Sequence, residues 1–271
     1  MPDVEITAEE LREIWNILSP EERVDGFHHV ERGDADNFFL HLSAREQSRL
    51  LTTMAEGERR LWLRLLAPDD AADVIQHAPL GRRADMLGLL DEATRQEVTA
   101  LMAYAEDAAG GLMSPRFARL RQEMSVSEAI RYLQRQAQEK LETFYYAYVL
   151  DQEQRLLGVV SFRDLFAAPG NAPLSAIMRA EVISVGENLD QEAVARLIAL
   201  HDLHAIPVVD DQRRMKGIVT VDDIVDVVQR EATEDIQKLG GMEALDTPYM
   251  QTSIFAMVKK RAGWLDRKSV V

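Results

Sequence analysis

The chain has 271 residues, of which 46% are hydrophobic and 28% are charged, a composition typical of a folded protein with more than one domain. Its 31 basic and 46 acidic side chains give a net charge of −15, which repels nucleic acid and anionic lipid and attracts cations. The absence of cysteine excludes disulfides, thiol catalysis and thiolate zinc sites.

The chain has neither a signal peptide nor a membrane-spanning run of apolar residues. Residues 1–15 lack the basic and apolar regions of a signal peptide. A run of about 18 apolar residues, the length needed to cross a bilayer, does not occur. We therefore expect the chain as given to be cytoplasmic.

Residues 1 to about 110 predict a helical domain, because apolar positions recur every three or four residues. Four helix-start patterns, each with a small or capping residue followed by acids, stand 24 residues apart. They begin at Ser19, Ser43, Ala67 and Asp91. A fixed period with two short helices in each repeat is typical of a right-handed helical solenoid. The alternative is an irregular helical bundle in which the spacing is coincidental.

Residues 114–230 contain a second repeat, built from short β-branched runs that alternate with helical ones. The segment Val149–Asp164 aligns with Val208–Asp223 at an offset of 59 residues. Each copy predicts a strand, a charged turn, a glycine-led strand and a helix start, preceded by a helix that begins near Ser127 or Gln191. Each copy is therefore a β-α-β-β-α unit, and two such units can pack sheet to sheet about a pseudo-twofold axis.

The second repeat resembles a tandem pair of cystathionine-β-synthase (CBS) domains. The resemblance rests on the Gly-φ-φ-Ser/Thr-x-x-Asp elements Gly158–Asp164 and Gly217–Asp223, and on the run His204–Asp210. With the helical domain, the junction 107–115 and the acidic run 221–236, nearly the whole chain resembles the cytosolic half of an MgtE-family magnesium transporter.

The resemblance implies a multidomain protein of the α + α/β class. Its parts would be an N domain (1–112), two CBS domains (113–172 and 173–235), a connecting "plug" helix (243–265) and an artificial tail (266–271). It further implies a homodimer through the CBS domains, and a transmembrane domain of the same full-length chain. The full-length protein would then place this region at the cytoplasmic face of the inner membrane.

The acidic run after the second copy indicates a cation site by its own chemistry. Asp222, Asp223 and Asp226 stand at a helix start, and further acids follow at helical spacing. So many neighbouring carboxylates repel one another unless a cation intervenes. Oxygen ligands without His or Cys suit Mg²⁺ or Ca²⁺. The alternative is a solvated acidic helix face.

The resemblance implies a wider set of magnesium ligands, between the helical domain and the CBS pair and around the connecting helix. The matching acids are Asp70, Asp190, Glu192, Asp202, Asp223, Asp226, Glu231, Glu234 and Asp235. A further acid of the family falls near Asp36. For Asp70 and Asp190 the alternative is stabilisation of a helix N-terminus, which needs no metal.

The resemblance also implies an ATP site in the cleft between the CBS copies. Ser161, Arg163 and Asp164 would address phosphate and ribose at a helix start, while Tyr146 would stack on the base. Leu203 and Ile206 would form an apolar wall. The alternatives are that Tyr146 belongs to the core and that the cleft binds nothing.

The resemblance implies a magnesium-sensing and gating region, in which bound Mg²⁺ favours a compact closed dimer. One alternative is an adenine-nucleotide-sensing CBS module attached to another transporter or enzyme, and another is a structural adaptor. We expect no catalysis, because the chain contains no His-Glu-x-x-His, Gly-x-Ser-x-Gly or P-loop pattern.

Overall fold

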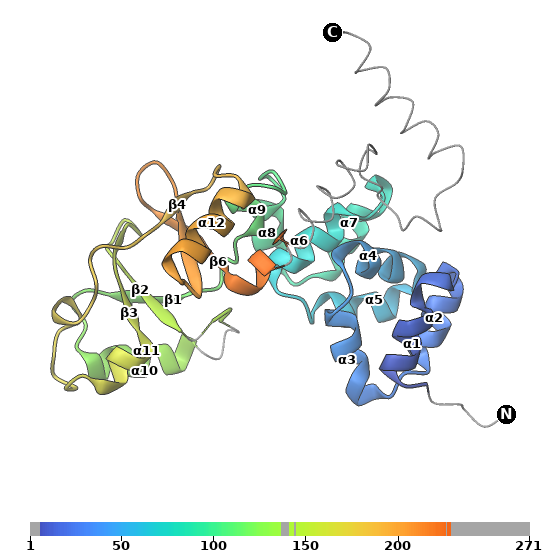
Figure 1. Cartoon of the computed structure of the whole chain (residues 1–271), viewed down its shortest axis with the longest axis horizontal. Coiled ribbons are helices and arrows are strands. Elements are labelled where there is room, and N and C mark those ends of the chain that lie inside the picture. Colours follow the sequence, from blue (N-terminus) through green and yellow to red (C-terminus); the bar gives the residue numbers. More distant parts are fainter. Residues whose placement is uncertain (1–5, 137–140, 144, 226, 229–271) are drawn as a thin grey trace, which may run out of the picture. The chain divides into compact units, whose positions relative to one another are not determined.

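The computed structural model describes residues 6–136, 141–143, 145–225 and 227–228 (Figure 1). The contacts divide the chain into two units, Met1–Val221 and Asp222–Val271. The first unit contains both the helical part and the strands of both sheets.

The N-terminal part is a succession of short helices. They are α1 (Ala8–Ile14), a 3-10 turn (Trp15–Ile17), α2 (Pro20–His28), α3 (Arg32–Leu40), α4 (Ala44–Thr53), α5 (Glu56–Leu63), α6 (Pro68–Gln76), α7 (Leu80–Leu89) and α8 (Glu92–Leu101). Ser19, Ser43, Ala67 and Asp91 are the N-caps of α2, α4, α6 and α8, as the 24-residue spacing predicts. Each of these helices contacts the next one in the series, so the repeats stack as in a solenoid.

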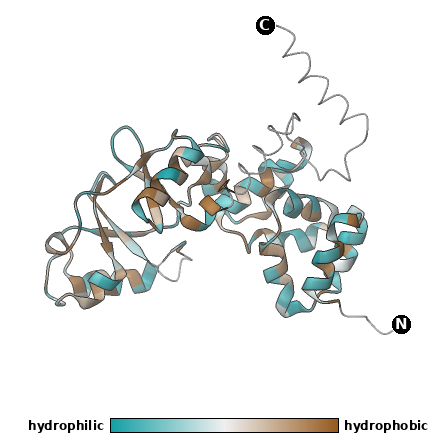
Figure 2. Ribbon diagram, viewed as in Figure 1, coloured by the Kyte–Doolittle hydropathy of each residue, from teal (hydrophilic) through white to brown (hydrophobic). Residues whose placement is uncertain are grey.

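Aromatic rings fill the core of the first repeats. Phe27 packs edge-on against Trp62 with ring centroids 4.8 Å apart, and Trp15 packs edge-on against Phe38 at 5.1 Å. Hydrophilic and hydrophobic residues alternate along these helices (Figure 2), as the amphipathic pattern requires. Most apolar side chains of these helices are therefore buried against neighbouring helices, although Leu61 and Leu80 are exposed.

Two three-stranded sheets form the second part of the chain among the described residues (Figure 1). The first copy consists of β1 (Ala118–Arg121), α10 (Val126–Gln136), β2 (Tyr146–Leu150), β3 (Leu156–Ser161) and α11 (Phe162–Ala167). The second consists of β4 (Val185–Gly186), α12 (Gln191–His201), β5 (Ala205–Val209) and β6 (Met215–Thr220), after which residues 221–225 are helical. In both sheets the middle strand is parallel to the first and antiparallel to the third. The predicted β-α-β-β-α repeat is confirmed.

The 59-residue offset extends to details of the hairpins. Gln154 and Arg213 occupy the same turn position, and both have a positive φ, of 64° and 61°. The two turns bond each other reciprocally, since the Leu156 amide donates to the Arg213 carbonyl at 3.0 Å and the Met215 amide donates to the Gln154 carbonyl at 2.9 Å. A shared core beneath these turns contains residues of both copies. The copies are thus related by an approximate twofold axis, as predicted.

The segment that precedes each copy pairs with the last strand of the other copy. Ser114 exchanges two backbone hydrogen bonds with Ile218 in β6, at 2.8 and 3.0 Å. Arg179 exchanges two with Val159 in β3, at 3.0 and 2.9 Å. The chain therefore crosses between the copies twice, once before each sheet.

Helix α10 begins earlier than the sequence analysis expected. Its capping box is made by Ser125 and Glu128, whose carboxylate accepts from the Ser125 amide at 2.8 Å. Ser127 lies inside the helix. The correction has a simple cause, because two serines two residues apart both match a start pattern and only Ser125 has Glu at the third position after it.

Candidate functional site

The proposed ligand of the helical domain, Asp70, lies in the first turn of α6 and is exposed. Its neighbour Asp69 is buried, with 7% of its surface exposed. Ala67, the N-cap, provides no side-chain hydrogen bond to this helix start. Two acids in the first turn fit the helix-stabilising alternative, and because Asp70 is exposed a cation can also approach it.

Helix α12 carries three of the proposed metal ligands. Asp190 is its N-cap and accepts from the Glu192 amide at 2.9 Å, while the Glu192 carboxylate pairs with Arg196 at 3.3 Å. Asp202 is its C-cap, in the left-handed conformation with φ 51°. Eleven helical residues separate the two caps, a length of about 17 Å, so Asp190 and Asp202 do not share one ion within the chain.

The remaining proposed ligands follow the second sheet. Asp223 lies in the second unit and is half-buried. Asp226, Glu231, Glu234 and Asp235 lie outside the described residues, as do the expected connecting helix and tail. Within the described ranges, no group of three or more His, Asp or Glu residues is close enough to hold a metal ion. In the same ranges, no helix has the length and hydropathy needed to cross a membrane.

The first copy brings Tyr146, Ser161 and Asp164, three of the proposed nucleotide residues, together. Tyr146 lies opposite Ser161 in the ladder of β2 and β3. Ser161 is the N-cap of α11, and its Oγ accepts from the Asp164 amide at 3.0 Å. Arg163 follows in the first turn and is exposed. The helix start that the sequence predicted for this site is present, and the Ser161 Oγ already accepts a hydrogen bond from its own helix.

The two residues proposed for the apolar wall, Leu203 and Ile206 of the second copy, differ in burial. Leu203 is half-buried, whereas Ile206 is fully buried. Ala205 joins the core that both copies share, against which Tyr146 packs. Because side chains alternate along a strand, Ile206 faces the other side of β5 from Ala205.

Sequence reasoning missed three side chains next to these residues. The rings of Tyr145 and His204 are stacked, with centroids 4.5 Å apart and planes 15° apart, and Tyr146 lies 6.4 Å from His204. Arg179 approaches the Asp164 carboxylate to 3.9 Å. The offset of 59 relates Tyr145 to His204 and was a signal that these two side chains meet near the twofold axis.

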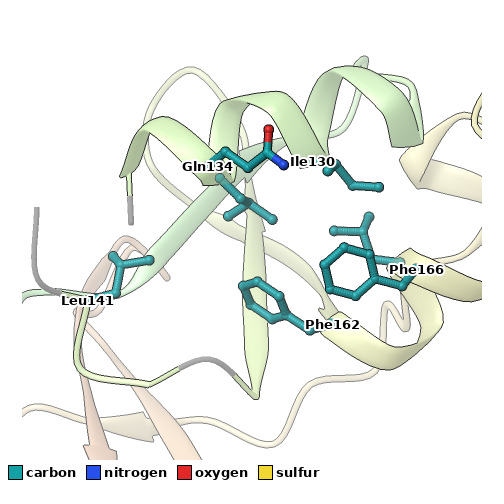
Figure 3. A pocket seen from close by; sticks show the side chains of 7 residues that line it. Ile130, Gln134, Leu141, Phe162 and Phe166 are labelled. Atoms are coloured by element: carbon teal, nitrogen blue, oxygen red, sulfur yellow. The ribbon is translucent and has the colours of Figure 1, made fainter. Parts of the chain in front are cut away.

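A separate cavity of about 320 Å³ lies in the first copy, between α10 and α11 (Figure 3). Phe162 and Phe166 from α11 lie across it from Ile130 and Gln134 of α10 (Figure 3). One amide is the sole polar side chain among its lining residues. The cavity offers no charged group to a phosphate, so it does not fit a nucleotide.

Comparison with known proteins gives consistent matches over nearly the whole chain. Residues 6–107 match the family model of the MgtE intracellular N domain, and residues 109–171 and 174–230 match that of the CBS domain. The magnesium transporter MgtE of Thermus thermophilus is 41% identical over 267 residues, which is 96% of this chain and 58% of that protein. The chain thus spans little more than half the length of that relative.

Two solved structures are similar to the fold described above. The crystal structure of the cytosolic domain of the Mg²⁺ channel MgtE in complex with ATP has a TM-score of 0.75 and 40% identity, covering 83% of this chain and 92% of that one. The crystal structure of the soluble part of a magnesium transporter has a TM-score of 0.65 and 31% identity, covering 83% and 93%. These relatives are magnesium transporters or parts of them and not enzymes, in agreement with the expectation of no catalysis.

Proposed function

Because the chain belongs to the MgtE family of magnesium transporters, we propose that it is the cytosolic part that senses intracellular Mg²⁺ and regulates transport by a membrane domain of the same protein. The observation that carries the proposal is the order of an MgtE N domain and two CBS domains, matched along 96% of the chain by a magnesium transporter. Expected homodimerisation through the CBS domains belongs to the same proposal.

The proposed ligands fit Mg²⁺ by their chemistry. Every one of them is a carboxylate, and exposed carboxylates that keep some water suit this ion. Asp70 belongs to the helical domain, Asp190 and Glu192 to the second CBS copy, and Asp223 to the segment that follows it. An ion held between any two of these regions would neutralise charges that otherwise repel.

The regulation then follows from a shift between two states. Without Mg²⁺, a net charge of −15 favours separated domains, whereas bound ions favour a compact state that holds the connecting helix in its closed position. Moving such an equilibrium from 1:99 to 99:1 takes about 5.5 kcal/mol of differential binding. Several weak sites acting together supply this amount and respond at millimolar concentrations.

Small-angle scattering during an MgCl₂ titration to about 20 mM tests the proposal, with an NaCl series matched in ionic strength. We expect a cooperative fall in the radius of gyration with MgCl₂ alone. Asp223→Asn and Asp226→Asn should move the midpoint to higher Mg²⁺. Asp211→Asn is the matched control, because it removes the same charge from an exposed hairpin turn outside the ligand set. Equal profiles in MgCl₂ and NaCl would reject magnesium sensing.

A second function, ATP binding in the first CBS copy, is supported by the similar structure that contains ATP and by the grouping of Tyr146, Ser161 and Asp164. We expect calorimetry with ATP to show one site for each chain. Tyr146→Ala should weaken binding about tenfold or more by removing the stacking ring, whereas Tyr146→Phe should preserve it. Equal affinity of all three proteins would exclude Tyr146 from the site. Nucleotide binding without any response to Mg²⁺ would favour the nucleotide-sensing alternative.

A further inference from the structure

A long-range side-chain contact joins the turn after α8 to the second CBS copy. Tyr104 follows α8 by three residues, in a turn in which its amide donates to the Leu101 carbonyl at 3.0 Å. Its hydroxyl donates to the Glu187 carboxylate at 3.0 Å, although the two residues are 83 positions apart. The contact therefore ties the turn that follows α8 to the turn between β4 and α12.

The backbone reinforces this contact at the same place. The Ala109 and Gly110 amides donate to the Leu189 and Glu187 carbonyls at 2.7 and 2.8 Å, and the Gln191 amide donates to the Asp107 carbonyl at 2.8 Å. Ala108 lies opposite Asp190 in this short ladder. The N-cap of α12 is thus held on one side by the segment that ends the helical domain.

The contacts between residues 104–110 and 187–191 form a joint in which the Tyr104 ring packs at a fixed position. A Cβ atom at Gly110 would lie 2.5 Å from the Tyr104 Cδ1 atom, so the ring rests directly against the glycine. Partial burial, and then the hydrogen bond to Glu187, raise the pKa of Tyr104 above its ordinary value. The hydroxyl is therefore protonated at neutral pH and able to donate.

We propose that Tyr104 is a positioning residue that couples the end of the helical domain to the N-terminus of α12 and thereby sets the orientation of Asp190 and Glu192 toward a shared cation. This inference rests on the magnesium-sensing function proposed above. Glu187 acts in it as a hydrogen-bond acceptor, through the Oε2 atom that accepts from the Tyr104 hydroxyl.

The test compares four variants of the whole chain with the parent protein. Tyr104→Phe removes the donor, Glu187→Ala removes the acceptor, and Glu187→Gln keeps an acceptor oxygen without the charge. Tyr132→Phe is the matched control, since it removes a hydroxyl from α10 in the other CBS copy. Hydrogen exchange at the Ala109, Gly110 and Gln191 amides is measured without metal, and the MgCl₂ midpoint is measured by scattering.

We expect Tyr104→Phe and Glu187→Ala to speed exchange at these amides on the order of tenfold, and to raise the MgCl₂ midpoint by about two- to tenfold. Glu187→Gln and Tyr132→Phe should resemble the parent protein in both measurements. A merely structural role would change exchange without moving the midpoint.

Three results would overturn the inference. Unchanged exchange in Tyr104→Phe would show that the contact does not hold the joint. Faster exchange with an unchanged midpoint would show that the joint does not position the ligands. A midpoint raised equally by Glu187→Gln and Glu187→Ala would show that Glu187 acts through its charge. If the parent protein does not compact with Mg²⁺, the proposed function fails and the positioning role fails with it, while the exchange data still report whether the joint exists.

Discussion

Gly158 and Gly217 are equivalent residues, and each lies where a segment of the other copy crosses its strand. A Cβ atom at Gly158 would lie 2.9 Å from the Arg179 carbonyl oxygen, and one at Gly217 would lie 2.7 Å from that of Ser114. Both distances are too short for any side chain. The glycine of the repeated Gly-φ-φ-Ser/Thr-x-x-Asp element therefore serves close backbone approach between the copies.

Replacement of Gly217 by alanine should lower the free energy of unfolding by about 1–3 kcal/mol, because the new methyl group meets backbone and Met113 atoms that have little room to move. Urea denaturation measures the loss. Gly186→Ala is the control, since nothing lies within 4 Å of a Cβ atom at that strand position. Equal effects of the two substitutions would contradict this explanation of why glycine occupies the equivalent position in both copies.

Asp210 stabilises the hairpin between β5 and β6. Its carboxylate accepts from the backbone amides of Gln212 and Arg214 and from the Arg214 guanidinium, each at 2.9 Å, and it lies 3.3 Å from the Lys216 ammonium. Burial by itself would raise the pKa of Asp210, but these donors outweigh burial and hold the pKa below its ordinary value of 3.8. Asp151 occupies the equivalent position in the first copy.

The lowered pKa predicts that the contribution of Asp210 to stability is fully present above about pH 4 and is lost as pH falls toward the folded-state pKa. We expect the free energy of unfolding of Asp210→Asn to be lower at neutral pH and to fall less steeply below pH 4 than that of the parent protein. Denaturation at a series of pH values measures both slopes. Asp211→Asn, an exposed neighbour, is the control, and parallel slopes for parent and Asp210→Asn would refute the prediction.

At the scale of secondary-structure elements, helices α2, α4, α6 and α8 of the solenoid begin with the same N-cap geometry. The N-caps Ser19, Ser43, Ala67 and Asp91 all have an extended backbone, with φ from −60° to −67° and ψ from 150° to 163°. Three of them accept a hydrogen bond from the helix through their side chains, while Ala67 has none to offer. The backbone geometry of the cap thus persists where the capping side chain is absent.

Ala67→Ser should raise the free energy of unfolding by about 0.5–1 kcal/mol, because a serine in this geometry can accept from an amide in the first turn of α6, as Ser19 does in α2. Thermal and urea denaturation both report the gain. Ala84→Ser, at an exposed position inside α7, is the control and should be neutral or slightly destabilising. A gain of equal size at both positions would point to a cause other than capping.

At the scale of the whole molecule, two kinds of interaction differ in their dependence on charge: packing in the apolar core and repulsion among the excess acidic side chains. The two CBS copies are joined by their common core and by reciprocal hydrogen bonds, which do not depend on charge state. The acids, by contrast, gather at exposed helix ends such as Asp70 and Asp190. Ions should therefore change how these regions associate without changing the fold of each one.

The proposed Mg²⁺ sites predict a gain in stability by linkage. MgCl₂ at about ten times the compaction midpoint should raise the free energy of unfolding by about 1.4 kcal/mol for each site, and EDTA should remove the gain. Denaturation with and without MgCl₂ measures it, against NaCl of equal ionic strength. An equal gain in NaCl would assign the effect to screening.

The sequence by itself determined the features that depend on residues a few positions apart. The 24-residue period located the N-caps of α2, α4, α6 and α8, and the 59-residue offset predicted the two matching sheets, because capping, hairpin turns and amphipathic faces are local interactions. Even there, two neighbouring serines both fit the start pattern of α10, and the capping residue is Ser125 and not Ser127.

Only the tertiary structure decided which distant residues meet. Ser114 pairs with Ile218, Tyr145 stacks on His204, and Tyr104 reaches Glu187. No periodicity specifies such pairs, because they depend on how complete elements pack and on where the chain crosses between the copies. Among the described magnesium ligands that the resemblance implies, Asp70 lies in α6 and Asp190 caps α12, so whether they meet depends on packing and not on spacing along the chain.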